Sequence, residues 1–439
     1  MRDSPAPVRL VLAGAILLAG CAALAGCAAL SRTGPPPAPP GFEVGLWVQA
    51  EGANRTLDDA GKIEALVRRA RKAGVTDLYV QVYRSGRAWF PTKLADDSPS
   101  RRAGRDPLAR VLRLAGGTAP SLRPLRVHAW INAFSLARNR EAPLLRELGP
   151  EAVLRDQHGR SLLDYPRDGR PPWAKGFVMG TPGIFLDPAH KGVRRRLAAI
   201  ARRLAQAYPA LAGVHLDFIR YPYALPISPG SRFSPRLDFG YGKEAAARFA
   251  SETGGRAPAA GVPPSETDPA AWDGWRRRQV TEAVREVREA IKAVRPGIVL
   301  SAAVLPWAER AYLSAFQDWR AWLREGLLDK ALVMAYTRDP ALAGHLARAA
   351  LAARPSMDAP LGGALPQKPP GDLKKAGGRV IVGLGAYLFT QRPEALWRQW
   401  RIARESGADG VALFSFDQMA GREAMWRFPR GRLPRGENP

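Results

Sequence analysis

The chain has 439 residues, of which 66 are Lys or Arg and 40 are Asp or Glu, so its formal net charge is +26. Its 46% hydrophobic content excludes a disordered or collagen-like chain and is sufficient for a large buried core. This length fits one large domain or two ordinary ones. The positive excess indicates anionic partners only weakly, because an arginine- and alanine-rich composition can also arise from coding bias.

The first 27 residues have the parts of an exported protein's signal. Arg2 and Arg9 precede an apolar run over residues 10–18. The string Leu-Ala-Gly-Cys then occurs twice, ending at Cys21 and Cys27. This string resembles the bacterial lipobox, whose cysteine receives the lipid; the shorter apolar run favours Cys21, with Cys27 as the alternative. A plain signal peptide or an anchor helix is the other interpretation. Alanine after either cysteine favours sorting to the outer membrane, so we expect a lipid-anchored protein of the bacterial cell envelope.

Residues 28–41 are predicted to be a proline-rich tether that holds the following domain away from the membrane. No later segment has 18 uncharged apolar residues, so no further membrane-spanning segment is expected. Cys21 and Cys27 are the only cysteines, which excludes a disulfide, a thiolate metal site and cysteine-based catalysis in the folded region. The five histidines include no His-x-x-x-His pair, and no cofactor or metal is expected.

Short β-rich apolar runs alternate with longer helical patterns through the rest of the chain. Eight strands are predicted, at residues 44–48, 78–83, 125–132, 213–219, 298–304, 331–336, 380–386 and 410–414. Helices are predicted at residues 57–73, 193–208, 271–294, 311–325, 342–353 and 394–406. Eight strand–helix units without a glycine-rich dinucleotide fingerprint favour an α/β fold of the closed (β/α)8 TIM-barrel type over an open doubly wound sheet.

The barrel is predicted to be one domain over residues 42–420, followed by a basic tail over 421–439. Long insertions at residues 135–188 and 222–270 follow the third and fourth strands, where barrels carry their chemistry, so we expect them to wall a cleft. The arginine runs at 194–196 and 276–278 are expected to be solvated helix faces. Asp187, followed by Pro188, is predicted to be the N-cap of a helix.

The most informative segment is Gly213–Pro222, with the sequence GVHLDFIRYP. On a strand, His215 and Asp217 share one face, while the apolar residues between them occupy the other. If the apolar face packs against helices, His215 and Asp217 point into the barrel, with Asp217 near its carboxyl-terminal mouth. A carboxylate there needs polar partners or a catalytic role, because burying an unpaired charge is costly. Arg220 is the expected neutralising neighbour, which leaves a purely structural Asp–Arg pair as the alternative.

Further strings share one resemblance with this segment: Val44–Val48 (VGLWV), Val80–Arg84 (VQVYR), His128–Asn132 (HAWIN), Leu186–Pro188 (LDP), Trp275–Arg277 (WRR) and Val333–Tyr336 (VMAY). With them, residues 42–420 resemble the glycosyl-hydrolase-like family 10, a group of bacterial lipoproteins. The resemblance implies a TIM barrel that binds or cleaves cell-envelope or extracellular polysaccharide. More distantly, the chain is similar to glycosidases that cleave partly deacetylated amino-glycans.

The chain departs from this family at two places. Many relatives carry an acidic pair where this chain has Asp217 followed by Phe218, and relatives tend to have an acidic residue in the loop where residues 85–88 read SGRA. Both departures weaken a direct transfer of catalytic roles.

Glycoside cleavage normally uses two carboxyl groups, of which Asp217 is the first candidate. Candidates for the second follow other strands: Glu51, Glu309, Asp339 and Asp417. Asp417 and Glu309 rank first and almost equally. Asp417 is close to its strand, and the loop of Glu309 could reach a sugar, although Glu309 could also simply begin the next helix.

Aromatic and polar side chains at or just past the strand ends suit the apolar faces and polar edges of sugars. The predicted substrate-binding residues are Trp47, Gln81, Arg84, Trp130, Asn132, His215, Arg220, Tyr221, Trp307 and Tyr336. We therefore expect an envelope-anchored glycoside hydrolase acting on an amino-sugar or anionic polysaccharide. The alternative is a catalytically inactive barrel that binds envelope glycan as a scaffold. Export argues against a nucleic-acid partner, and the sequence leaves the oligomeric state open.

Overall fold

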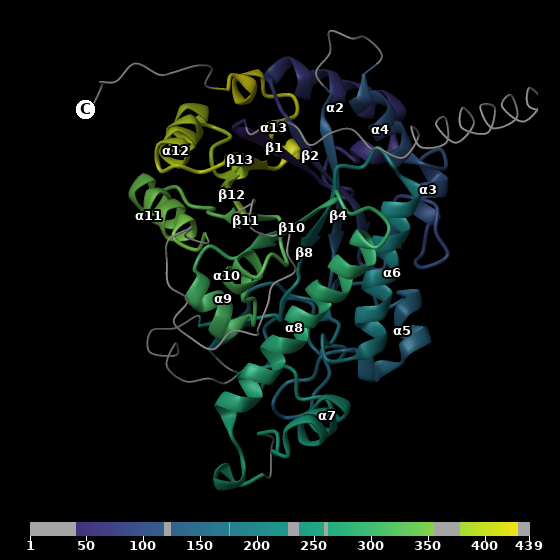
Figure 1. Ribbon diagram of the computed structural model, residues 1–439, viewed down its shortest axis with the longest axis vertical. Coiled ribbons are helices and arrows are strands. Elements are labelled where there is room, and N and C mark those ends of the chain that lie inside the picture. The colour runs from purple at the N-terminus through teal and green to yellow at the C-terminus, as the bar shows by residue number, and fades with distance from the viewer. Residues whose placement is uncertain are drawn as a thin grey trace, which may run out of the picture. The chain divides into compact units, whose positions relative to one another are not determined.

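The computed structural model describes residues 41–117, 124–174, 176–226, 237–258, 262–354 and 378–428. Within them, eight parallel strands form a closed ring, because β1 pairs with β13 on one side and with β2 on the other. In ring order the strands are β1 (Glu43–Val48), β2 (Asp77–Arg84), β4 (Arg126–Asn132), β8 (Gly213–Asp217), β10 (Val299–Val304), β11 (Lys330–Met334), β12 (Arg379–Gly385) and β13 (Gly410–Phe414). The predicted (β/α)8 TIM barrel is confirmed, with a strand at every predicted place (Figure 1).

The predicted signal and both candidate lipidation cysteines, Cys21 and Cys27, lie outside the described residues, as does almost all of the tether. The basic tail is described only as far as residue 428.

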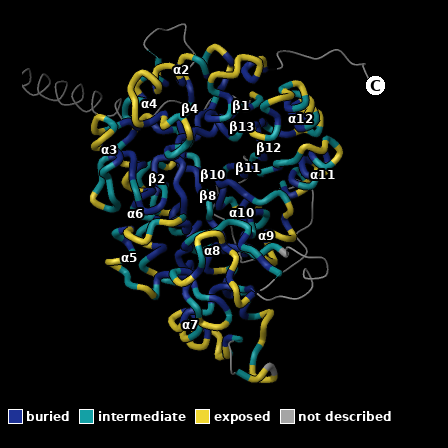
Figure 2. The backbone as a smooth tube through the Cα atoms, turned by 180° about the vertical axis from the view of Figure 1, so that it is seen from behind, coloured by how far each residue is buried: buried dark blue, intermediate teal, exposed yellow. Residues whose placement is uncertain are grey.

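Helices surround the ring and turn one apolar face toward it, while their outer faces are exposed (Figure 2). They are α2 (Ala60–Ala73), α4 (Pro107–Gly116), α6 (Lys191–Ala207), α8 (Pro269–Lys292), α9 (Ala308–Ser314), α10 (Trp319–Arg324), α11 (Pro340–Leu351) and α12 (Pro393–Glu405); shorter elements are β3 (Arg87–Ala88), α3 (Ser98–Arg102) and α13 (Phe416–Met419). Helix α2 begins later than predicted because the Asp59 side chain accepts a hydrogen bond from the Lys62 N–H and caps the helix there. Over the described ranges, none of the helices is both long and apolar enough to cross a membrane.

The prediction of one continuous helix over residues 311–325 is wrong, because the chain breaks between α9 and α10. Phe316 at the break has a left-handed φ of 50°, and Gln317 is buried. The Gln317 side chain accepts a hydrogen bond from Leu305 N (2.9 Å) and donates to the carbonyls of Ile219 (3.4 Å) and Ala303 (3.3 Å). The break therefore pairs three backbone groups near the strand ends that a continuous helix would leave unsatisfied.

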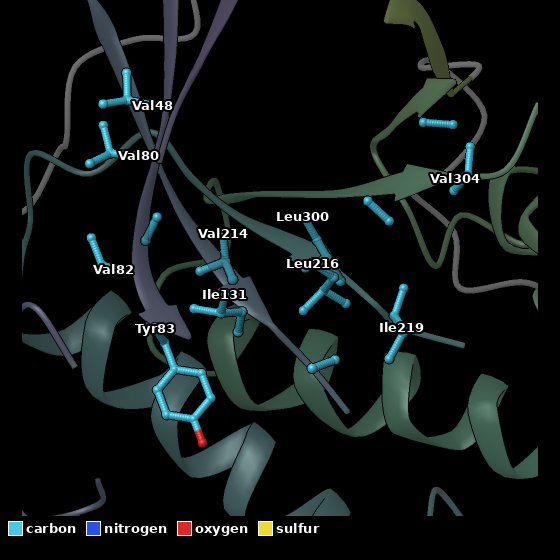
Figure 3. Packing of buried hydrophobic residues seen from close by; sticks show 14 of the residues in the cluster. Val48, Val80, Val82, Tyr83, Ile131, Val214, Leu216, Ile219, Leu300 and Val304 are labelled. Carbon is cyan, nitrogen blue, oxygen red and sulfur yellow. The ribbon is translucent and has the colours of Figure 1, made fainter. Parts of the chain in front are cut away.

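The alternation of side chains along the strands divides the apolar residues into two cores. Outward residues, among them Val80, Ile131, Val214, Leu216 and Leu300, pack against the helices (Figure 3). Inward residues fill the barrel itself: Trp47, Tyr79, Trp130, Leu332, Ile381 and Ala412, with Phe414 beside them. Glycine at position 383 leaves room for this filling, since a Cβ there would come within 3.0 Å of the Trp47 indole.

A buried charge network closes the amino-terminal end of the barrel. Its floor carboxylates are Glu43 and Asp77, both completely buried. Lys330 Nζ lies 2.6 Å from Glu43 and 3.4 Å from Asp77, while Arg126 Nε (2.9 Å) and His128 Nε2 (2.8 Å) contact Asp77. Burial opposes ionisation, but the His128 hydrogen bond and the Lys330 charge hold the pKa of Asp77 well below its usual range. Asp77 therefore stays charged, and this end of the barrel is fixed by ion pairs rather than open to ligand.

The two long insertions are joined to each other. The first contains β5 (Ser135–Ala137), α5 (Pro143–Leu148), β6 (Phe177–Met179) and β7 (Ile184–Phe185), and the second contains β9 (Ala224–Pro226) and α7 (Lys243–Thr253). Strands β6 and β9 pair antiparallel, and the Trp272 and Trp275 side chains of α8 pack against Phe249 of α7. The insertions therefore extend the barrel on the side of the third and fourth ring strands.

The prediction that both arginine runs are solvated is wrong for Arg194 and Arg276. Arg276 is only 1% exposed and forms ion pairs with Asp238 (2.8 Å) and Asp273 (2.6 Å). Arg194, 6% exposed, pairs with Glu286 at 2.8 Å. The helical period alone places these arginines on a polar face. In the folded chain, carboxylates from other elements, Asp238 for Arg276 and Glu286 for Arg194, join Asp273 of the same helix as Arg276 and pair with the buried guanidinium groups.

The prediction that Asp187 is the N-cap of the helix that follows it, α6, is wrong. His190 takes that position, with its Nδ1 accepting a backbone N–H of the first turn. Asp187 is instead buried, and its Oδ1 accepts hydrogen bonds from Ala189 N (2.8 Å) and the Tyr221 hydroxyl (3.5 Å). Burial raises the pKa of Asp187 to about 7, and the nearby charge of Glu244 adds to the effect.

Candidate active site

Asp217 ends β8 on the inward face of the barrel, as the alternation predicts. Its Oδ2 accepts a hydrogen bond from Trp130 Nε1 (3.2 Å) and its Oδ1 accepts one from the Phe218 N–H (2.7 Å). Phe218 has a left-handed φ of 51°, so the chain turns sharply directly after the carboxylate. Burial raises the pKa of Asp217, although both hydrogen bonds and the charges of Arg220 and Arg84 oppose the shift.

His215 lies one inward position below Asp217 and is completely buried. Trp47 Nε1 donates to His215 Nε2 (3.1 Å), and His215 Nδ1 lies 3.0 Å from the Ser301 hydroxyl. Because an indole N–H can only donate, Nε2 must accept and Nδ1 must carry the proton of the neutral ring. Burial and the charge on His128 and Lys330 hold the pKa of His215 well below its usual range, in agreement with a neutral ring. His215 and Trp47 therefore support the layer below the mouth and present no surface to a ligand in this structure.

Two amide side chains stand at the mouth beside this layer. Gln81 Nε2 donates to Asn132 Oδ1 (3.1 Å), while Gln81 Oε1 accepts from the Ala50 N–H (3.2 Å). These bonds fix the orientation of both amides. Asn132 pairs in register with Asp217 on the neighbouring strand, so the predicted position of Asn132 at the mouth is confirmed.

An aromatic cluster lies across the barrel from the amides and reaches the surface. The Phe414 ring is stacked on Tyr336 (centroids 5.5 Å apart) and meets Trp130 (6.3 Å) and Tyr387 (6.4 Å) edge-on. Tyr387 is 42% exposed. Burial raises the pKa of Tyr336, with a contribution from the charge of Asp217, which places the phenol near that carboxyl. Tyr387 is absent from the predicted binding residues, although its position directly after the seventh predicted strand is a signal that the sequence contains.

The arginines at the mouth differ in their partners. Arg84 pairs with Glu51 (3.1 Å), which also pairs with Arg87 (3.3 Å). Arg220, expected to neutralise Asp217, forms no ion pair with it at 4.0 Å or less and instead donates to the Tyr221 carbonyl (3.2 Å). The structural Asp–Arg pair is therefore absent as a direct contact, and the influence of Arg220 on Asp217 is through space.

The candidates for a second carboxylate occupy different surroundings. Asp417 Oδ1 accepts from the Asn54 N–H (2.8 Å), whereas its buried Oδ2 has no hydrogen-bond partner in the described ranges. Glu309 lies in the first turn of α9, largely exposed, and pairs with Arg320 (2.7 Å). Asp339 caps α11. Asp417 is thus the candidate with a buried carboxylate oxygen that no described group pairs.

The remaining predicted binding residues divide between core and surface. Tyr221 is buried, with its ring edge-on to Phe316 at 5.1 Å, and so presents no open face. Trp307 is 42% exposed, just before α9, and its ring lies 5.5 Å from that of His345. A search of the described residues finds no group of three or more His, Cys, Asp or Glu side chains arranged to hold a metal ion.

A sequence profile of the family described as glycosyl hydrolase-like 10 matches residues 44–356, which is most of the chain. The chain belongs to this family. Glycosyl hydrolase DigH of Escherichia coli K12 is 25% identical to this family member over 281 residues, covering 59% of this chain and 54% of the relative. Glycosyl hydrolase YngK of Bacillus subtilis strain 168 is 22% identical over 281 residues, covering 59% of this chain and 45% of the relative. The chain spans about half the length of the curated relatives it matches.

Solved structures show the same fold. The catalytic domain of β-amylase from Paenibacillus polymyxa aligns with a TM-score of 0.54 and 11% identity, covering 90% of this chain and 96% of that one. A β-galactosidase from the psychrophilic Marinomonas ef1 aligns with a TM-score of 0.51 and 12% identity, covering 85% of this chain and 54% of that one. At these identities the likeness shows the barrel alone. The protein is thus a glycosyl hydrolase-like TIM barrel of the glycosyl hydrolase-like 10 family.

Proposed function

We propose that this family member is a glycoside hydrolase of the bacterial cell envelope that acts on an amino-sugar or anionic polysaccharide. The observation that carries the proposal is Asp217, an inward carboxyl at the end of β8 whose pKa is raised by burial. A raised pKa suits a general acid, which must hold its proton until it meets the glycosidic oxygen. Membership of the family supports a polysaccharide as the substrate.

In this proposal Asp217 protonates the leaving oxygen, and the Trp130 and Phe218 N–H groups keep its carboxyl group oriented. Asp417 is the proposed second carboxylate, acting as base or nucleophile. It is preferred to Glu309 because Glu309 is held by Arg320 at the surface, whereas Asp417 Oδ2 is unpaired within the described part of the chain.

The aromatic cluster supports sugar as the ligand. Tyr387 is 42% exposed and meets Tyr336 edge-on, and Asn132 offers a fixed amide; such a combination suits the apolar faces and polar edges of a pyranose. The formal charge of +26 favours an anionic polymer, because it raises the concentration of anionic chains near the surface.

Attachment to the envelope through the lipobox cysteine is part of the same proposal. It predicts incorporation of labelled palmitate into the protein expressed in a bacterium. Cys21→Ala abolishes the labelling if Cys21 is the lipidated residue, and Cys27→Ala abolishes it if Cys27 is. Labelling that survives both single substitutions and the double substitution contradicts a lipid anchor at this place.

One observation favours a second candidate function, a barrel that binds glycan without cleaving it. Each alternative to Asp217 already has a partner: Glu51 pairs with arginines, Glu309 with Arg320, Asp339 with the first turn of α11, and Asp417 through one oxygen with Asn54. If none of them acts as the second carboxylate, the mouth would hold a sugar without the second group that cleavage normally needs.

The test measures new reducing ends released from peptidoglycan, partly deacetylated amino-glycan and neutral glucan. The hydrolase proposal expects release from at least one of them, a large loss in Asp217→Asn and Asp417→Asn, and little change in Glu309→Gln. Asp164→Asn, an exposed carboxylate of the first insertion, is the matched control. Binding to a glycan without any release supports the scaffold, and Asp217→Asn with unchanged activity contradicts the role of Asp217.

A further inference from the structure

Two arginines without a carboxylate partner flank one tyrosine near the candidate active site. Arg220 is only 5% exposed, and its guanidinium carbon lies 5.2 Å from the centre of the Tyr223 ring. Arg310, exposed on α9, lies 5.4 Å from the centre of the same ring. Across the described ranges, no carboxylate comes within 4.0 Å of either guanidinium. The cluster is therefore cationic, and no described carboxylate contacts it, although the charge of Asp217 acts on Arg220 from a greater distance.

The cluster joins two parts of the chain that are distant in sequence, the connection between β8 and β9 and the helix α9. Arg220 belongs to the turn after β8, Tyr223 directly precedes β9, and Arg310 is on α9. The Tyr223 ring edge lies against Gly180, where a Cβ would collide with it, and the Gly180 N–H donates to the Tyr223 carbonyl (2.9 Å). The first insertion thus fixes the ring that both cations contact.

The electrostatics of this arrangement call for an anion. Burial of an arginine without a carboxylate costs free energy that contact with the Phe218 and Tyr223 rings offsets only in part. Burial accordingly lowers the pKa of Arg220. The charge of Arg220 also acts on Asp217, so the cluster adjoins the candidate acid. A ligand anion beside Arg220 and Arg310 would supply the missing counter-charge.

We propose that Arg220, Tyr223 and Arg310 form a subsite that binds the carboxylate of an acidic sugar next to the sugar attacked at Asp217. The subsite rests on the proposed function, since it requires a glycan in the barrel mouth. The planar guanidinium of an arginine binds a carboxylate through two parallel hydrogen bonds, which selects acidic sugars over neutral ones.

The experiment compares two matched pairs of ligands with the whole protein by ligand-observed NMR, which also shows whether each ligand stays intact. Methyl β-glucuronide and methyl β-glucoside differ only at C6, while N-acetylmuramic acid and N-acetylglucosamine differ by an ether-linked carboxylate. The acid in at least one pair is expected to bind about tenfold more tightly than its neutral counterpart. The pair that shows the preference indicates whether the subsite binds a carboxylate at C6 of the sugar or one on an ether-linked substituent.

Arg220→Gln and Arg310→Gln are each expected to remove the preference, while Arg68→Gln, an exposed arginine on α2 with the same charge change, keeps it. Because Arg310 is exposed, its substitution is not expected to unfold the protein. If Arg220→Gln lowers the melting temperature, the effect of Arg310→Gln on the acid preference tests the subsite. Equal binding of acid and neutral sugar in both pairs, no binding of either acid, or a preference that survives both substitutions overturns the subsite. A preference for the acid without turnover of any polysaccharide supports the subsite and contradicts the hydrolase proposal. Turnover of neutral glucan without a preference for the acid supports the hydrolase proposal and contradicts the subsite.

Discussion

The buried carboxyl of Asp187 makes the stability of the protein depend on pH in a direction opposite to that of most acidic groups. Its pKa is about 7 in the folded chain, against 3.8 for an unperturbed aspartate. Between these values the folded state holds a proton that the unfolded state has released. By linkage, the free energy of unfolding therefore falls as pH rises through this window, by about 1.4 kcal/mol per pH unit. Asp187→Asn removes the titration while keeping an oxygen that can accept the Ala189 N–H.

The expected result is a difference between variant and wild type that grows with pH. From pH 5 to pH 8 only the two units below pH 7 contribute, so the variant gains about 3 kcal/mol relative to wild type. Urea unfolding followed by tryptophan fluorescence at several pH values measures this difference. Since all other groups are shared by the two proteins, their titrations cancel. The exposed carboxylate variant Asp164→Asn is the control for the loss of one carboxylate.

A difference between Asp187→Asn and wild type that stays constant within about 0.5 kcal/mol over this range would refute the argument. Such a result would mean that Asp187 is ionised in the folded protein, with its charge compensated by a group such as Arg276, whose charge already favours ionisation. A difference that shrinks with rising pH would contradict the sign of the shift.

Three other substitutions follow from the structure. Lys330→Met removes a cation shared by both floor carboxylates and should destabilise the protein by about 3–5 kcal/mol in urea unfolding at pH 7; a loss below about 1 kcal/mol contradicts the network. Gln317→Ala leaves three backbone groups unpaired and should cost about 3 kcal/mol in the same assay, with Gln418→Ala, a glutamine elsewhere on the barrel, near neutral. Trp130→Phe removes a hydrogen bond that favours the charged form of Asp217, so the pKa of this acid should rise, and the alkaline limb of any pH–rate profile should move to higher pH; a shift to lower pH contradicts this.

Local patterns were sufficient for the barrel and for the inward direction of its key side chains. Each ring strand is a short β-rich apolar run, and the alternation of polar and apolar residues along β8 predicts that His215 and Asp217 share the inward face. The same reasoning places Asn132 at the mouth. These predictions succeed because the pleat of a strand and the period of a helix are properties of neighbouring residues, and hydrophobic burial on one face then fixes the orientation.

The tertiary structure decided what the polar residues do, because their partners come from distant parts of the chain. Arg276 on α8 pairs with Asp238 of the second insertion, and Gln317, in the break between α9 and α10, donates to the carbonyls of Ile219 and Ala303. Arg220 was expected beside Asp217, yet it lies against Tyr223, which the first insertion holds in place. A charge or an amide costs free energy when buried alone, and only the folded chain determines which group meets it. The sequence by itself determined the barrel and its inward acid; the surroundings that set the pKa of that acid, and the cations beside it, were decided by tertiary packing.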